Sequence, residues 1–367
     1  MIKSHFLCFI LLIGISNKLF CYSIDSVFSS PVRGLCIKAP NHDEINNFVE
    51  FISQELAPRS INTLILRIDY SYEFKSRPEL VDEGALSESD VNKIVTVCKE
   101  NDINLIPQIN LFGHQSWAGS LGKLLEVYPQ FDETPDVELP DDYEWPNEDG
   151  LYCKSYCPLH PEVHDVVFDL VDEICEAFES DAFHAGMDEV FYISEEQCTR
   201  CNGTDPAEIY AAEITKIRNH LKLKKRRLWI WGDRLIDGKI TGLGEWEASM
   251  NNTARAIDMI PKDVVICDWH YNKPVSTPVY FSMKGFNVIS CPWKKSSVGI
   301  GQQEDMDHFR ANATLEMKSR YAGVMQTVWT SASKFIEGLK SINPNTSDLE
   351  AENSWTCFYN LFPNKKD

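Results

Sequence analysis

The chain has 367 residues, of which 43% are hydrophobic, so it can bury a sizeable core as one large domain or two ordinary ones. Its 35 basic and 55 acidic residues give a formal charge of −20, which repels polyanions. Nucleic acids and heavily sulfated or carboxylated polysaccharides are therefore poor candidate partners, and a neutral or cationic ligand fits better.

Residues 1–24 have the pattern of a signal peptide. Lys3 supplies a positive start, and the apolar run from Phe6 to Ile15 is too short to span a bilayer but long enough for a signal-peptide core. We expect cleavage between about Cys21 and Ser26, and a secreted or periplasmic domain over 27–367. Lipid anchoring at Cys21 is a minor alternative. We expect no later segment to cross a membrane.

Eight short apolar runs alternate with amphipathic stretches along the rest of the chain. Helix starts between them include Ser87 with Asp90, and Asp205-Pro206 with Glu208. Continuous apolar runs are typical of strands covered on both faces, as in a parallel sheet. Eight such units predict an α/β fold with a single (β/α)8 TIM barrel, and a doubly wound open sheet is the alternative. The runs cover 32–38, 63–69, 105–111, 182–190, 228–233, 264–269, 287–293 and 323–329.

Acidic, histidine and aromatic residues lie at the ends of these runs or directly after them. In a barrel the carboxyl ends of the strands meet at one rim, where barrel enzymes build their sites. Adjacent buried acids such as Asp188 and Glu189 are costly unless they are solvated, paired or functional. Aromatic faces around carboxylates suit a sugar, whose C–H faces stack while its hydroxyls bind the acids. The rim residues are Asp69, His114, Asp188, Glu189, Trp231, Asp268, Trp269, Tyr271, Trp293 and Trp329.

Four cysteines form two close pairs, one on each side of the acidic run. Cys153 and Cys157 precede it, and Cys198 and Cys201 follow it. In an exported protein we expect disulfides, and one structural zinc held by all four thiolates is the alternative. A catalytic metal is less favoured because four thiolates leave no open position.

The residues around the acidic pair resemble a known family. The run from His184 to Glu189, His-Ala-Gly-Met-Asp-Glu, is similar to the His-x-Gly-Gly-Asp-Glu motif of glycoside hydrolase family 20, the β-N-acetylhexosaminidases, with Met187 in place of the second glycine. Further matches, in the same order as in the family, are Arg33-Gly34, Asp69, residues 106–114 and Trp231-Gly232-Asp233. The resemblance covers about residues 31–335, and we expect the additional amino-terminal domain of many members to be absent.

This resemblance implies a substrate-assisted retaining mechanism without a cofactor. Glu189 would be the general acid and then the base, and Asp188 would hold the 2-acetamido group of the substrate, whose oxygen attacks the anomeric carbon. Asp69 and His114 would support the acid, and Arg33 would bind ring hydroxyls. The remaining substrate-binding residues implied are His184, Asp268, the rim tryptophans Trp231, Trp269, Trp293 and Trp329, and Tyr271. The expected partner is an oligosaccharide or glycoconjugate.

Two departures from the family pattern leave other functions open. Gln108 and Asn110 stand where the family usually has Glu and Asp, and no Glu follows Trp329 to grip outer hydroxyls. The alternatives are a carbohydrate-binding barrel without turnover and a conventional retaining glycosidase with a different sugar specificity.

Overall fold

The computed structural model describes residues 28–117, 119–139, 153–343 and 347–364. Within them, eight parallel strands close into a barrel in the order β1-β10-β9-β8-β7-β6-β3-β2. β1 is hydrogen-bonded to both β2 and β10, so the sheet has no open edge and the doubly wound alternative is wrong. The predicted signal peptide and Cys21 lie outside the described residues.

The barrel strands coincide with the eight predicted runs. Several runs extend past the carboxyl end of their strand, because the apolar segment continues into the loops that form the rim. The strands are β1 (Val32–Lys38), β2 (Thr63–Arg67), β3 (Asn104–Leu111), β6 (Ala182–Gly186), β7 (Arg227–Trp231), β8 (Val265–Trp269), β9 (Asn287–Cys291) and β10 (Tyr321–Thr327). A short hairpin of β4 (Ser116–Trp117) and β5 (Ser120–Leu121) follows β3.

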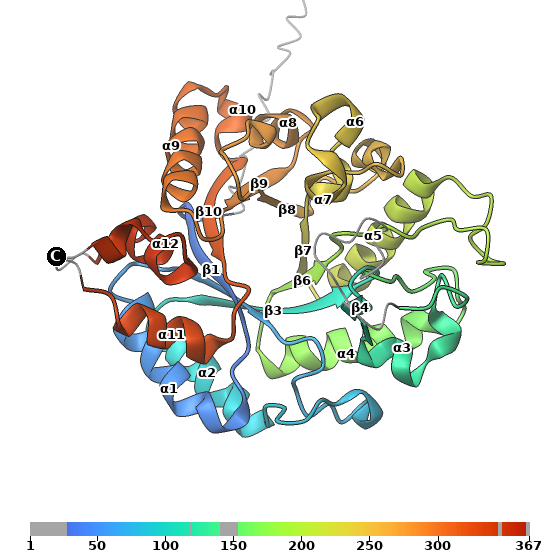
Figure 1. Ribbon diagram of the computed structural model, residues 1–367, viewed down its shortest axis with the longest axis horizontal. Coiled ribbons are helices and arrows are strands. Elements are labelled where there is room, and N and C mark those ends of the chain that lie inside the picture. Colours follow the sequence, from blue (N-terminus) through green and yellow to red (C-terminus); the bar gives the residue numbers. More distant parts are fainter. Residues whose placement is uncertain (1–27, 118, 140–152, 344–346, 365–367) are drawn as a thin grey trace, which may run out of the picture.

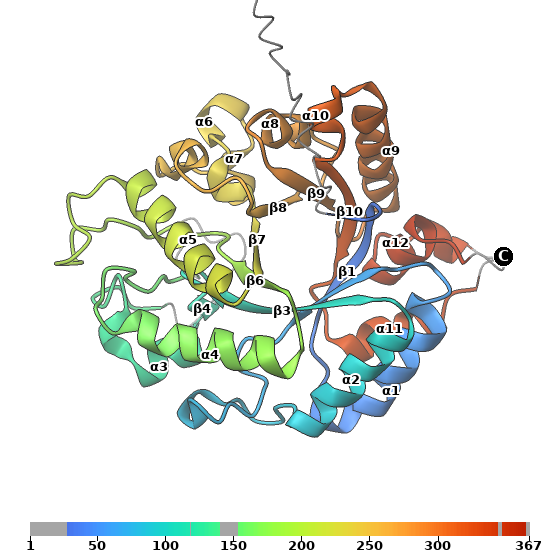
Figure 2. The same ribbon diagram turned by 180° about the vertical axis from the view of Figure 1, so that it is seen from behind.

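Helices surround the barrel on its outer side, as both views show (Figures 1 and 2). The predicted capping box is present at α2, where the Ser87 hydroxyl accepts from the backbone N–H of Asp90, and Asp205 caps α5. The longer helices are α1 (Ile45–Phe51), α2 (Glu88–Glu100), α4 (Val163–Ala177), α5 (Pro206–Leu223), α8 (Thr277–Met283), α9 (Ser296–Asn312), α11 (Ala332–Lys340) and α12 (Ser354–Leu361). The short ones are α3 (Lys123–Val127), α6 (Gly238–Thr241), α7 (Gly244–Glu247) and α10 (Leu315–Lys318).

Alternate residues of each strand face two separate cores. A large cluster fills the space between the strands and the helices, and a smaller one fills the barrel interior. On β1, for example, Val32 and Cys36 belong to the interior, whereas Leu35 and Ile37 face the helices. The position of a residue along its strand therefore decides whether its side chain can reach the rim site or packs under a helix.

No helix among the described residues combines the length and the apolar character needed to cross a membrane.

Candidate active site

Asp188 and Glu189 lie just after β6, where the chain leaves the regular strand. Met187 and Glu189 have φ of +71° and +48°, which breaks the alternation of a strand and lets two adjacent carboxylates turn to the same side. The hydroxyl of Tyr210, on α5, donates to the Met187 carbonyl at 2.7 Å and fixes this turn. Met187 thus holds a left-handed conformation, which favours glycine and which explains the glycine usual at this position in the family motif.

Two glycines bring the loop after β3 against this turn. A Cβ on Gly113 would lie 2.5 Å from the Asp188 carbonyl oxygen, and a Cβ on Gly186 would lie 2.4 Å from Oδ1 of Asn110. Only glycine permits both approaches. Asn110 in turn accepts from the side-chain amide of Gln108 at 2.9 Å, so the two amides that replace the family's acids bind one another inside the barrel.

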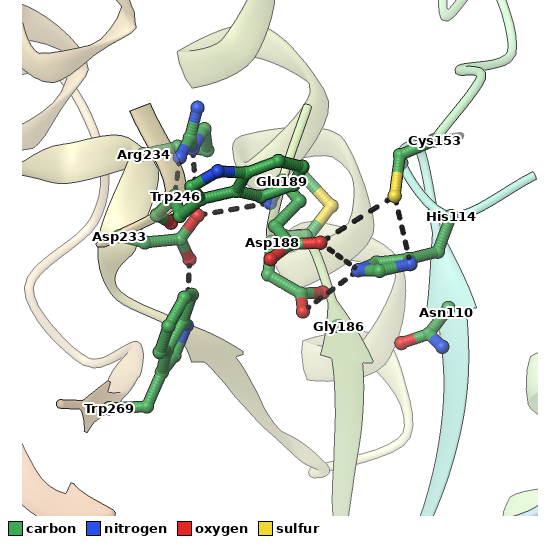
Figure 3. A network of polar contacts seen from close by, with 12 residues as sticks. Asn110, His114, Cys153, Gly186, Asp188, Glu189, Asp233, Arg234, Trp246 and Trp269 are labelled. Carbon is green, nitrogen blue, oxygen red and sulfur yellow. Dashed lines mark hydrogen bonds and ion pairs between the residues drawn. The ribbon is translucent and has the colours of Figure 1, made fainter. Parts of the chain in front are cut away.

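His114 joins the two carboxylates (Figure 3). Its Nε2 lies 3.1 Å from Oδ2 of Asp188 and 3.2 Å from Oε2 of Glu189, and its Nδ1 lies 3.3 Å from Sγ of Cys153. Burial alone would lower the pKa of His114, but the adjacent Cys153 and Asp188 raise it well above its ordinary value. A protonated His114 can therefore donate a hydrogen bond from Nε2 to Asp188 and form an ion pair with Glu189, while Cys153 contacts the other side of the ring.

Asp233 and Arg234 support the backbone of Glu189 from the other side. Oδ2 of Asp233 accepts from the Glu189 backbone N–H at 3.0 Å and from Nε of Arg234 at 2.7 Å. Its Oδ1 accepts from the indole N–H of Trp269 at 3.3 Å. Burial raises the pKa of Asp233 to about 6 although Arg234 opposes the shift. Asp233 and Arg234 therefore fix the backbone position from which the Glu189 side chain extends.

A chain of aromatic side chains borders the carboxylates. Tyr271 lies 5.0 Å from Trp269 and 5.4 Å from Trp293 between ring centroids, and its hydroxyl accepts from the indole N–H of Trp329 at 3.0 Å. Trp231 packs 6.2 Å from Trp329. Trp231 and Trp269 are 1% and 8% exposed, whereas Trp329 is 38% exposed and thus the most accessible stacking surface of the four tryptophans.

Several polar atoms at the site have no hydrogen-bond partner within the described chain. Oδ1 of Asp188 is a buried acceptor without a donor, and the indole N–H groups of Trp231 and Trp293 are buried donors without acceptors. Buried polar groups are normally satisfied, because leaving one unpaired costs roughly 1–3 kcal/mol. Such atoms are the ones that a bound ligand can satisfy.

Two residues predicted to bind substrate lie elsewhere. Arg33 is near the amino-terminal end of β1 and faces the helices, where it donates to the Arg59 carbonyl at 3.3 Å and lies 5.0 Å from the Phe362 ring. Asp268 also has the outward position on its strand and accepts from the hydroxyl of Thr277, on α8, at 2.6 Å. Both predictions of a pocket position are wrong, because these residues occupy helix-facing positions of their strands.

Two further predicted residues lie beside the site rather than at the carboxylates. Oδ1 of Asp69 accepts from the backbone N–H of Asn110 at 2.9 Å, and burial raises the pKa of Asp69. His184 lies inside the barrel, with its ring 4.5 Å from that of Trp231 and its Nδ1 accepting from the Gly186 backbone N–H at 3.1 Å. Burial lowers the pKa of His184 to about 3, so its ring is neutral at pH 7.

Sequence reasoning missed three residues of the site. Arg67 ends β2, donates to the Val328 carbonyl at 3.0 Å and lies 4.4 Å from the Trp329 ring, with its buried Nε unpaired within the described chain. A basic residue at an inward position of an apolar run was the available signal for it. Asp233 was placed at the end of its run and in the family match, but no role was predicted for it. Cys153 was assigned to a cysteine cluster, but it lies 3.5 Å from Glu189.

The four cysteines are not arranged as predicted. No disulfide joins the described cysteines, and Cys153 lies at His114, away from the other three. Cys157, Cys198 and Cys201 gather around Glu133 instead. Cys153 and Cys157, although close in the sequence, therefore belong to two different clusters.

Known proteins resemble the chain in sequence and fold. It is 27% identical over 292 residues to β-hexosaminidase subunit B1 of Dictyostelium discoideum, covering 71% of this chain and 47% of that protein. It is 26% identical over 224 residues to β-hexosaminidase A of Caenorhabditis elegans, covering 54% and 38%. The structure of Flavobacterium johnsoniae chitobiase shares the fold with a TM-score of 0.61 at 16% identity, covering 90% and 48%.

The chain spans less than half the length of both of these curated relatives. The match to a protein family covers more of the chain. Residues 54–344 match the family described as glycosyl hydrolase family 20, catalytic domain. This match begins shortly after α1, ends beyond α11 and includes Asp188, Glu189 and His114. The chain belongs to glycosyl hydrolase family 20.

Proposed function

We propose that the protein is an exported β-N-acetylhexosaminidase-type glycosidase, which removes β-linked N-acetylhexosamine from oligosaccharides or glycoconjugates by substrate-assisted retaining catalysis. The observation that carries the proposal is the buried Asp188 Oδ1, an acceptor for which the described residues offer no donor, beside the second carboxylate, Glu189. A 2-acetamido N–H is a donor of the kind this oxygen lacks. Family membership and the names of the relatives support the same substrate class.

In the proposed reaction the two carboxylates have different tasks. Glu189 protonates the glycosidic oxygen as its bond to the anomeric carbon breaks, and the acetamido oxygen of the substrate attacks that carbon to form an oxazolinium ion. Asp188 accepts the acetamido N–H and balances the positive charge of this ion. Glu189 then takes a proton from a water molecule as the oxygen of that water attacks the anomeric carbon. The bond from this carbon to the acetamido oxygen breaks, so the oxazolinium ring opens and the product keeps the β configuration.

The surrounding residues orient these groups. A protonated His114 holds Asp188 and Glu189 at a fixed separation, and Asp233 fixes the Glu189 backbone. Tyr271 and Trp329 offer a surface for the sugar ring, and Arg67 offers an N–H for a hydroxyl. Export through residues 1–24 is part of the proposal and rests on their amino-acid pattern alone.

Nitrophenyl glycosides of N-acetylglucosamine, N-acetylgalactosamine and glucose test the substrate class. We expect hydrolysis of the acetylated sugars and little of the glucoside. Glu189→Gln should lower kcat by roughly 10²- to 10⁴-fold on substrates with a poor leaving group, because the general acid is lost. Glu176→Gln is the matched control, since Glu176 lies at the end of α4 and pairs with Lys224. Wild-type activity of Glu189→Gln contradicts the assignment.

The role of Asp188 has its own test. Asp188→Asn should cost several kcal/mol of transition-state stabilisation and so lower turnover, since an amide cannot balance the oxazolinium charge. A thiazoline mimic of that ion should inhibit much more strongly than N-acetylglucosamine. If the thiazoline does not inhibit and a 2-fluoro glycoside traps a covalent adduct, the protein is a conventional retaining glycosidase. If sugars bind without any turnover, it is a carbohydrate-binding barrel.

A further inference from the structure

Three buried cysteines and one buried glutamate form a cluster outside the carboxylate site. Sγ of Cys157 lies 3.2 Å from Sγ of Cys201 and 3.4 Å from Sγ of Cys198. The carboxylate of Glu133 places an oxygen within 4.8 Å of all three sulfurs. Glu133, Cys157 and Cys201 are 0% exposed and Cys198 is 4% exposed, so solvent does not stabilise charge here.

The chain places these four residues by local hydrogen bonds in two loops. Residues 131–133 pair with 155–157, because the Cys157 backbone N–H donates to the Phe131 carbonyl and that of Glu133 donates to the Ser155 carbonyl. Cys198 and Cys201 share a turn between β6 and α5, and the backbone N–H of Glu195 donates to Oε1 of Glu133 at 3.3 Å. The loop after β3 and the loop after β6 therefore meet at the cluster.

Neither a disulfide nor a plain apolar core accounts for this arrangement. Cys157 lies between two sulfurs at nearly equal distances, so oxidation with one would leave the other beside it as a lone thiol. The other carboxylate oxygen, Oε2 of Glu133, is buried without a hydrogen-bond partner in the described chain. A buried carboxylate oxygen that lacks a partner is costly, and a cation removes that cost.

We propose that Cys157, Cys198, Cys201 and Glu133 bind one Zn²⁺ as a structural site. Zn²⁺ prefers four ligands in tetrahedral geometry, accepts thiolate and carboxylate together, and is often held by a Cys-x-x-Cys pair such as Cys198 and Cys201. Four protein ligands fill the coordination shell, so the ion has no open position for catalysis.

The zinc would act on the candidate active site through position alone. It ties the loop carrying Cys157 to the loop that follows Asp188 and Glu189. Cys153 precedes Cys157 by four residues and contacts both His114 and Glu189, so the ion anchors the segment that supports these two residues.

Metal analysis of the purified full-length protein tests the proposal independently of any glycosidase activity. We expect about one zinc per chain, no stoichiometric iron or copper, and no loss of mass from disulfide formation. Cys201→Ala and Cys198→Ala should lose the zinc. Cys153→Ala and Cys175→Ala should keep it, the latter being a buried helical cysteine that serves as the matched control.

Stability measurements on the wild type cover the case in which the variants do not fold. A strong chelator should lower the melting temperature, and added zinc should restore it. Cobalt in place of zinc should give thiolate-to-metal charge-transfer absorption. The proposal is overturned if the wild-type protein contains no zinc. This holds both when its thiols are free and when a disulfide makes its mass two hydrogens lower. Loss of zinc from Cys153→Ala overturns the ligand set.

Discussion

Replacing Gly113 with alanine tests whether the close approach of two rim loops is what unites the carboxylates with His114. A Cβ at this position would lie 2.5 Å from the Asp188 carbonyl oxygen and 3.1 Å from Cγ2 of Val190. The first of these contacts is with backbone, which cannot rotate away. The loop after β3 must therefore move away from the turn that carries the two acids.

The size of that movement follows from the geometry. Ordinary contact requires at least 3.4 Å, so the loops must separate by about 1 Å. Nε2 of His114 lies 3.1 Å from Asp188 and 3.2 Å from Glu189, and an added separation of this size breaks the hydrogen bond to Asp188 and the ion pair with Glu189. Overpacking of this kind costs about 1–3 kcal/mol of stability, and a misplacement of about 1 Å can lower activity about 100-fold.

Urea denaturation and kcat/KM on a nitrophenyl N-acetylhexosaminide measure the two effects. Gly203→Ala is the control, because its Cβ meets nothing within 4 Å while its φ of +77° imposes a comparable loss of stability. We expect the control to lose stability and keep its activity, and Gly113→Ala to lose both. If Gly113→Ala keeps wild-type kcat/KM, the contact between His114 and the two acids does not control the reaction.

Two further variants test the barrel interior and the rim. His184 has a folded pKa of about 3, below its unfolded value near 6.5, so its contribution to stability is complete above pH 6.5 and declines as the pH falls toward 3. Between pH 7 and pH 5 the wild type should lose about 2 kcal/mol more unfolding free energy than His184→Gln does, and equal losses contradict the assignment. Arg67→Met should lower kcat/KM by roughly 10- to 100-fold through a lost hydrogen bond to a sugar hydroxyl, and an unchanged value removes Arg67 from the binding site.

The sequence was sufficient for the fold class and for the location of the acidic pair. Eight apolar runs separated by helical segments predict a barrel, because parallel strands buried on both faces need continuous apolar residues and a helical crossover. Asp188 and Glu189 were found because they are adjacent in the chain and lie at the end of one run. Both predictions rest on residues that are close together in the sequence. They therefore do not depend on how distant parts of the chain pack.

Side-chain direction was decided by the tertiary structure. Arg33 and Asp268 were expected at the site but face the helices, while Arg67 faces the site and was overlooked. Both faces of a barrel strand are apolar, so the hydrophobic pattern does not show which face is the interior. The closure of the barrel decides which face is the interior. Because side chains alternate along a strand, neighbouring residues point to opposite faces.

The meeting of distant loops was likewise decided by the tertiary structure. Cys157 and Cys201 are 44 residues apart and come within 3.2 Å, and Glu133 joins them from the same loop as Cys157. Cys153, only four residues from Cys157, instead contacts His114. Spacing in the sequence identified cysteines that could act together but not their partners, because those partners are set by which rim loops pack against each other once the barrel has closed.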